Sequence, residues 1–158
     1  MKNIRTLCLL LLTVLIGGCA SGPEAPGFAK VQAPVITPDA NSGVVYFVRE
    51  RAHTGRDFSY YLHEGEAVVG VLQSGSYFML KAAPGVHTYW AATDVEKDLV
   101  DVTLKVEAGK RYFIEGGVHV GFWGEHPELN EVSEETAGQI LPDLDYVALT
   151  AAGAARAE

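Results

Sequence analysis

The chain has 158 residues, of which 48% are hydrophobic, and carries 12 basic and 20 acidic side chains for a formal net charge of −8. This length suffices for one domain with its own apolar core. The acidic balance argues against nucleic acid as a partner, because binding nucleic acid requires a basic face. Both cysteines, Cys8 and Cys19, precede the rest of the chain, which therefore has no disulfide and must be stabilised by apolar burial.

Residues 1–18 have the organisation of a secretory signal peptide. Lys2 and Arg5 precede an apolar run over residues 7–16, and small residues follow. The run is too short for a permanent membrane-spanning helix, which needs about 20 residues. The sequence Ile16-Gly17-Gly18-Cys19 resembles a bacterial lipoprotein box. This resemblance implies that the chain is cut before Cys19, which then carries acyl chains such as palmitate.

A lipidated Cys19 makes the membrane the expected partner of this protein. Removal of Lys2 and Arg5 takes the net charge to −10, so charge does not hold the protein on an anionic bilayer and the acyl chains must do so. In lipoproteins of Gram-negative cells the residue after the cysteine influences sorting. This chain has Ala20 at that position and not Asp, which favours sorting to the outer membrane, where the domain would face the periplasm.

Residues 19–42 are predicted to be a flexible, lipid-anchored tether. Four prolines lie among small residues in this stretch, and no apolar period of 2 or 3.6 is visible. Such a tether would hold the domain about 25–40 Å from the membrane. The alternative is that part of the stretch packs as an edge strand, for which residues 33–36 are the best candidates.

From Gly43 onward, short β-type runs alternate with turn signals. The run over residues 44–48 is β-branched and aromatic throughout, which is typical of a strand covered on both faces. Glu64 and Gly65 predict a tight hairpin, and Pro84 with Gly85 predicts another turn. The expected strands cover residues 44–48, 58–62, 67–72, 77–80, 86–93, 100–106, 111–114 and 129–132.

The clearest alternation of apolar and polar residues lies in residues 100–106. Leu104 shares one predicted face with three valines, and Asp101, Thr103 and Lys105 occupy the other. We expect the apolar face to be buried in the core.

A short helix is expected after the last strand. Ser133 is suited to cap its start, acidic residues follow in the first turn, and Pro142 stops it after residue 141. Residues 150–158 are small and featureless and are predicted to be a disordered tail. The predicted fold over residues 43–149 is therefore an all-β, antiparallel β-sandwich of immunoglobulin-like or transthyretin-like type. It would contain seven to eight strands and the short C-terminal helix.

Several turns and strands together resemble one family. They are the start of the first strand, the segment 70–78, the turn 84–87 and the turn 107–113, in this order. The set resembles the bacterial lipoprotein family known as domain-of-unknown-function family 2846, over residues 43–149. That family often has proline after the arginine of the first strand, where this chain has Glu50. The resemblance implies a β-sandwich on a lipid anchor, without an established activity and without catalytic residues.

We find no catalytic constellation and predict no enzyme, no cofactor and no metal site. Gly75 and Ser76 lie in a turn and not in a nucleophile elbow. His119 and His126 flank a glycine-rich stretch and are expected to approach one another with Glu125 or Glu128, but a zinc site needs three or four ligands. His87 is expected to form hydrogen bonds beside its turn. The two remaining histidines, His53 and His63, lie on separate predicted elements.

Phe122 and Trp123 form the candidate interaction surface, in a stretch from Gly117 to Pro127 that is expected to be a loop at the end of the sandwich. They either plug the open end of the domain or form an exposed anchor for a protein, glycan or lipid surface. The predicted function is that of a non-catalytic binding or scaffolding module, with an envelope protein or a glycan as partner. The alternatives are a metal-binding or hydrolytic periplasmic enzyme and a purely structural spacer.

Overall fold

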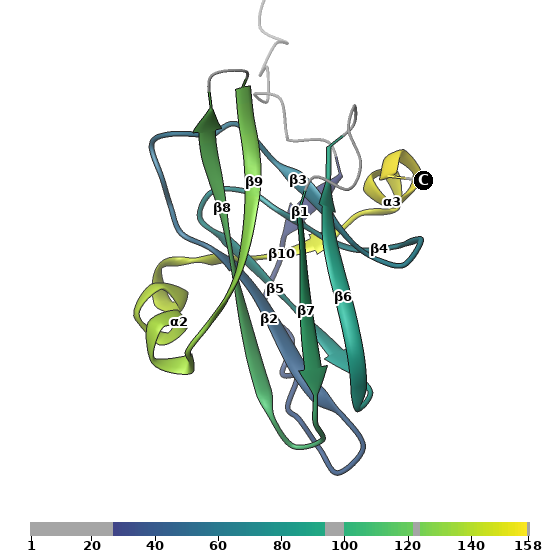
Figure 1. Ribbon diagram of the computed structural model, residues 1–158. Helices are drawn as coiled ribbons and strands as arrows, with labels where there is room; N and C mark the ends of the chain where they lie inside the picture. Colours follow the sequence, from purple (N-terminus) through teal and green to yellow (C-terminus); the bar gives the residue numbers. More distant parts are fainter. Residues whose placement is uncertain (1–26, 94–99, 122–123, 158) are drawn as a thin grey trace, which may run out of the picture.

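The computed structural model describes residues 27–93, 100–121 and 124–157. Within these ranges the chain forms ten β-strands, two short α-helices and one 3-10 turn. The strands make two sheets that pack face to face, and the helices lie at the periphery (Figure 1). The prediction of an all-β domain is confirmed.

The larger sheet has six strands. In spatial order they are β1 (Phe28–Lys30), β10 (Asp145–Leu149), β5 (Ser76–Ala82), β2 (Gly43–Arg49), β8 (Arg111–Gly121) and β9 (Gly124–Val132). Two of its pairs, β2 with β8 and β10 with β5, are parallel. The expectation of a purely antiparallel sandwich was therefore wrong. The chain builds the whole second sheet between β2 and β8, and this long connection permits parallel pairing.

The smaller sheet has four strands, and all its pairs are antiparallel. Gly65 forms the turn between β3 (Tyr60–Glu64) and β4 (Ala67–Leu72) with a φ of 58°, in the left-handed region that glycine adopts readily, so the predicted hairpin is confirmed. In spatial order the strands are β4 (Ala67–Leu72), β3 (Tyr60–Glu64), β6 (Gly85–Ala92) and β7 (Val100–Val106).

The main core lies between the two sheets. Phe47 of β2 stacks on Phe78 of β5, with ring centroids 4.7 Å apart, and meets Tyr89 of β6 edge to face. Gly116 of β8 faces Tyr60, whose hydroxyl occupies the space that a Cβ atom at residue 116 would need. The buried apolar core residues are Val45, Phe47, Tyr60, Leu62, Leu72, Phe78, Ala82, Tyr89, Ala91, Leu104, Val106, Ile114, Leu129 and Val147.

Two of the ten strands were not expected. β1 lies inside the predicted tether and pairs antiparallel with β10, so the tether prediction does not hold from Phe28 onward. The edge strand that the alternative placed at residues 33–36 is thus found a few residues earlier. β10 follows Pro142 closely and has only five residues, which left it unrecognised as a strand. The count of seven to eight strands was too low for this reason.

The glycine-rich stretch between Gly117 and Pro127 was predicted to be a loop. In the structure β8 and β9 extend through it and pair as a long hairpin, up to the pair Gly121 and Gly124. The two residues between Gly121 and Gly124 in the sequence, Phe122 and Trp123, lie outside the described residues.

The predicted helix is confirmed as α2 (Glu134–Ile140). Ser133 caps it by accepting a hydrogen bond of 3.1 Å from the backbone N–H of Thr136. It ends in the 3-10 turn η1 (Leu141–Asp143), where Pro142 cannot supply the N–H that a continuing helix requires. A second helix, α3 (Ala151–Ala157), occupies the stretch that was predicted to be a disordered tail, so that prediction was wrong.

The alternation in β7 is confirmed, and it yields a stability prediction. Leu104 is 1% exposed, whereas Thr103 and Lys105 are exposed. We expect Leu104→Ala to lower the free energy of unfolding by about 2–5 kcal/mol, because it leaves a cavity in the core. Thr103→Ala, on the opposite face, removes only an exposed cross-strand hydrogen bond to Thr88 and should cost about 1 kcal/mol or less. Urea denaturation of both variants checks this, and a loss at residue 104 no larger than that at residue 103 would contradict the assignment of the buried face.

Candidate binding groove

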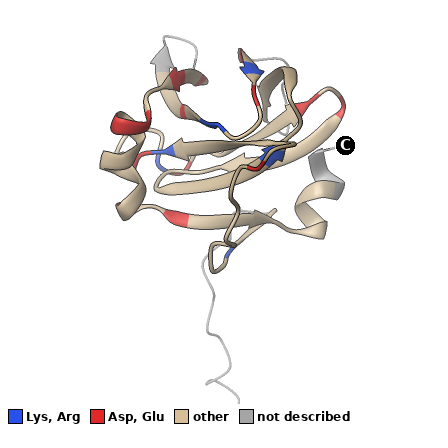
Figure 2. Ribbon diagram, turned by 90° about the horizontal axis from the view of Figure 1, so that it is seen from below, with Lys and Arg blue, Asp and Glu red and all other residues tan. Residues whose placement is uncertain are grey.

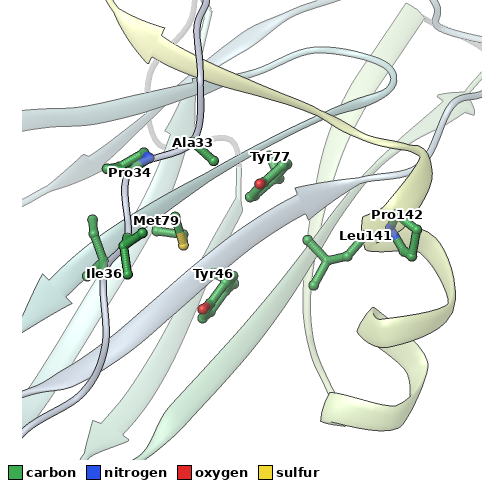
Figure 3. A pocket seen from close by; sticks show the side chains of 9 residues that line it. Ala33, Pro34, Ile36, Tyr46, Tyr77, Met79, Leu141 and Pro142 are labelled. Atoms are coloured by element: carbon green, nitrogen blue, oxygen red, sulfur yellow. The ribbon is translucent and has the colours of Figure 1, made fainter.

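A groove of about 430 Å³ opens on the outer face of the six-stranded sheet, the face turned away from the other sheet (Figure 3). This volume lies within the range of small-ligand sites. None of the lining residues is charged. They are Ala33, Pro34, Val35, Ile36, Tyr46, Tyr77, Met79, Leu141 and Pro142.

The floor of the groove consists of outward-facing residues of β2 and β5. Tyr46 alternates with the core residues Val45 and Phe47 and therefore points to the outer face. Its ring stacks on Phe113 of β8, with centroids 4.9 Å apart. Tyr77 packs edge to face against Tyr146, with centroids 5.3 Å apart. These ring contacts fix the orientation of both tyrosines.

The floor presents neutral hydroxyl groups. Burial, together with the neighbouring Tyr46, raises the pKa of Tyr77 above its ordinary value. Burial and then Tyr77 raise the pKa of Tyr146 in the same way. Protonated phenols donate and accept hydrogen bonds, and their rings offer flat apolar surface. The floor therefore suits non-covalent recognition of an uncharged ligand.

One wall of the groove is an extended segment that we call the strap, residues 31–42. It begins where the Val31 N–H donates to the Tyr146 carbonyl at 3.1 Å, and it crosses the outer face of β5 to reach the start of β2. Pro34 and Pro38 lack the N–H groups that a strand in a sheet would donate, so the strap covers the sheet without joining it.

Asp39 fastens the far end of the strap. Its carboxylate accepts hydrogen bonds from the Lys81 Nζ at 2.7 Å, the Ser42 hydroxyl at 2.7 Å and the Asn41 N–H at 2.9 Å. These bonds, that of Lys81 first, hold the pKa of Asp39 well below its ordinary value. Because Lys81 lies on β5, the bond ties the strap to the sheet on which the groove lies.

The opposite wall is formed by Leu141 and Pro142 of η1. Helix α2 brings them there: its Ala137 is fully buried, and Arg111 of β8 forms an ion pair of 2.7 Å with Glu134. Figure 3 shows the two tyrosine rings and Met79 lying between the strap and η1. The signals that end α2 thus also set the width of the groove.

A second, more polar pocket of about 390 Å³ lies on the other side of η1. Arg51 contributes to it and also contacts Asp145 at 3.4 Å. Its remaining lining residues are Glu50, Gln139, Ile140, Asp143 and Leu144.

The histidine pair expected from the sequence is present. His119 and His126 face each other across β8 and β9, and the His119 Nδ1 lies 3.9 Å from the Glu128 Oε1. Over the described ranges, no three His, Cys, Asp or Glu side chains are grouped so that they could hold a metal ion. His63, by contrast, is buried and stacks on Trp90 with ring centroids 4.0 Å apart.

Cys19, Phe122 and Trp123 are outside the described residues, so their predicted roles stay predictions. Conversely, the sequence reasoning treated Tyr46 and Tyr77 only as strand residues and missed the groove. Ile36, an apolar residue between the prolines of the strap that is partly buried in the structure, was the signal that this stretch packs on the sheet.

Sequence reasoning also missed the buried arginine at the end of β2. Arg49 is only 2% exposed and lies over the ring of Tyr60. Its guanidinium donates to the carbonyls of Phe58 and Gly55 at 2.7 and 2.6 Å. Arg49 thereby holds the loop between β2 and β3 against the sandwich.

His87 forms the hydrogen bonds predicted for it, to Glu64 at 2.5 Å and to the Ala83 carbonyl at 2.8 Å. Burial alone would lower the pKa of His87, but these two bonds and the charge of Glu64 raise it above its ordinary value. The folded state therefore binds the proton more tightly than the unfolded state, and the pair stabilises the protein most at low pH.

We expect the free energy of unfolding of the parent protein to exceed that of His87→Gln most below about pH 6.5. The difference should shrink as the pH rises through the raised pKa of His87. Urea denaturation across this range measures it, and the same series in a Glu64→Gln background serves as the control, where the pH dependence should be much smaller. A difference that grows with pH would refute the assignment.

No family model, curated protein or solved structure matches this chain.

Proposed function

We propose that this protein is a lipid-anchored lipoprotein of the bacterial cell envelope that acts as a non-catalytic binding module. The signal-like residues 1–18 and the box that ends in Cys19 support the anchor. Within the described part of the chain, no helix has the length and apolar character to cross a membrane. Ala20 supports placement in the outer membrane, facing the periplasm.

We also propose that the two packed sheets are a variant of the immunoglobulin-like or transthyretin-like sandwich. A six-stranded sheet facing a four-stranded sheet over one core supports this assignment. The resemblance to domain-of-unknown-function family 2846 remains a prediction of the same kind.

The observation that carries the binding function is the uncharged, tyrosine-floored groove beside the strap. Grooves lined by aromatic side chains bind extended, proline-containing segments, in which the peptide itself is preformed. The same sheet face already accepts such a segment, because the strap with Pro34 and Pro38 lies extended across it. We therefore assign as ligand an extended, uncharged segment of another envelope protein.

Exposed apolar residues near the groove also support this face of the molecule as the binding surface. Val35, on the rim of the groove, is 95% exposed, and Val31, at the start of the strap, is 46% exposed. A partner that covered these side chains would gain apolar burial, which supports this side as a contact surface. Val86, on β6 of the other sheet, is 72% exposed and gives an isolated position for comparison.

The anchor is tested by fractionation. Cys19→Ala should move the protein from the membrane fraction to a soluble or unprocessed form, because the acyl chains then have no site of attachment. Mass spectrometry of the parent protein should find acyl groups on Cys19. A Cys19→Ala protein that stays in the membrane after its signal is removed would refute the proposal.

The groove is tested by site-specific photocrosslinking in the anchored protein. A photoreactive phenylalanine analogue at position 35 should give a discrete crosslink, and the same analogue at position 86 should not. Mass spectrometry of the product should identify an extended, uncharged segment of an envelope protein. A glycan product, a crosslink to a second copy of this chain, or equal yields at both positions would contradict the assignment.

A further inference from the structure

The described domain is fixed to its own N-terminal chain from Gly27 onward. The Thr150 N–H donates to the Gly27 carbonyl at 2.9 Å, and Gly27 packs against Tyr61 and Gly153 of α3 so closely that a Cβ atom would lie within 3 Å of both. Three residue pairs then join β1 to β10. Any lipid-anchored segment before Gly27 therefore joins the domain beside α3.

The proposed tether is much shorter than residues 19–42 suggested. Eight residue steps separate Cys19 from Gly27. Fully extended they span at most about 29 Å, and a flexible chain of this length has an average end-to-end distance of about 16 Å. A compact domain of this size is about 35 Å across, so the path from one side around to the other is about 55 Å. The tether cannot reach that far.

The two helices mark the opposite sides of the molecule. In both Figure 1 and Figure 2, α2 and α3 lie at opposite ends of the view. The side at α3 is thus held toward the anchor, and the side at α2 lies a domain diameter farther away.

The charges on the two helices favour the same orientation. The first turn of α2 carries Glu134 and Glu135, with no basic residue in its last turn. The first turn of α3 has no acidic residue, and Ala151 and Ala152 are exposed there. Glu134 is paired with Arg111, so Glu135 is the acidic residue through which an anionic bilayer repels the first turn of α2 more strongly than that of α3.

We infer that the anchored protein lies on the membrane surface with its α3 side, at Gly27 and Ala152, against the lipid headgroups, and with α2 turned away. This inference rests on the proposed lipidation of Cys19. It makes the lipid bilayer a second, orienting partner of the folded domain and not only of the acyl chains.

The test uses the full lipidated protein in vesicles of phosphatidylethanolamine and phosphatidylglycerol that contain a nitroxide-labelled headgroup lipid. Ala152→Cys and Glu135→Cys are matched single-thiol variants, because each changes an exposed residue at the second position of a short helix. The folded part of the chain has no other cysteine to react. A fluorophore at position 152 should be quenched several-fold more than one at position 135.

A long Gly-Ser insertion between Gly22 and Pro23 is the control, since it frees the domain to turn and should bring the two quenching values together. Equal quenching at both positions in the protein without the insertion would overturn the inference. Flotation of that protein with the vesicles would show in the same experiment that the anchor is intact. If the protein does not float with the vesicles and carries no acyl group, the proposed lipidation fails, and the orientation fails with it.

Discussion

The structure depends on the burial of β2 on both of its faces. Val45 and Phe47 point into the core, and Val44 and Val48, on the outer face, are as fully buried. Burying one such side chain is worth about 1.5–3 kcal/mol. A strand between two sheet neighbours with apolar residues on both faces requires a cover on its outer side as well as a second sheet on its inner side.

The strap and α2, with η1, cover the outer face of the sheet from two sides. The groove is the part of that face that lies between them and stays uncovered. Its floor is made by the same outward-facing positions, at Tyr46 and Tyr77, that would otherwise need covering. Tyrosine suits such a position because its ring packs on a neighbour while its hydroxyl contacts water or a ligand. The proposed binding site is thus a consequence of how the sheet is covered and not an addition to the fold.

Local patterns in the sequence were sufficient to predict several elements of the fold. The period of two in β7, the turn at Gly65 and the capping of α2 by Ser133 are decided by neighbouring residues, and all three are confirmed. The parallel pairing of β2 with β8 is decided by residues far apart in the chain, and no local pattern reports it.

Two further errors have specific physical causes. The stretch from Gly117 to Pro127 was predicted to be a loop because it is rich in glycine, but it forms the β8–β9 hairpin. Its neighbour Gly116 is a glycine because the Tyr60 hydroxyl occupies the space of a side chain, and not because the chain turns there. The prolines of the strap were taken as signs of a flexible tether. They prevent pairing in a sheet but not packing on one, so Ile36 is partly buried and Asp39 is bound to Lys81.

We propose that the gap between the strap and η1 is a binding site and not merely a place where the outer cover of the sheet is incomplete. The most direct measurement fills that gap and follows the crosslink from position 35. Ala33→Trp places a large ring in the groove, whereas Ala83→Trp adds the same ring at an exposed site between β5 and β6. We predict that Ala33→Trp abolishes the crosslink at an unchanged melting temperature and that Ala83→Trp leaves both unchanged. A crosslink that persists in the folded Ala33→Trp protein would contradict the account.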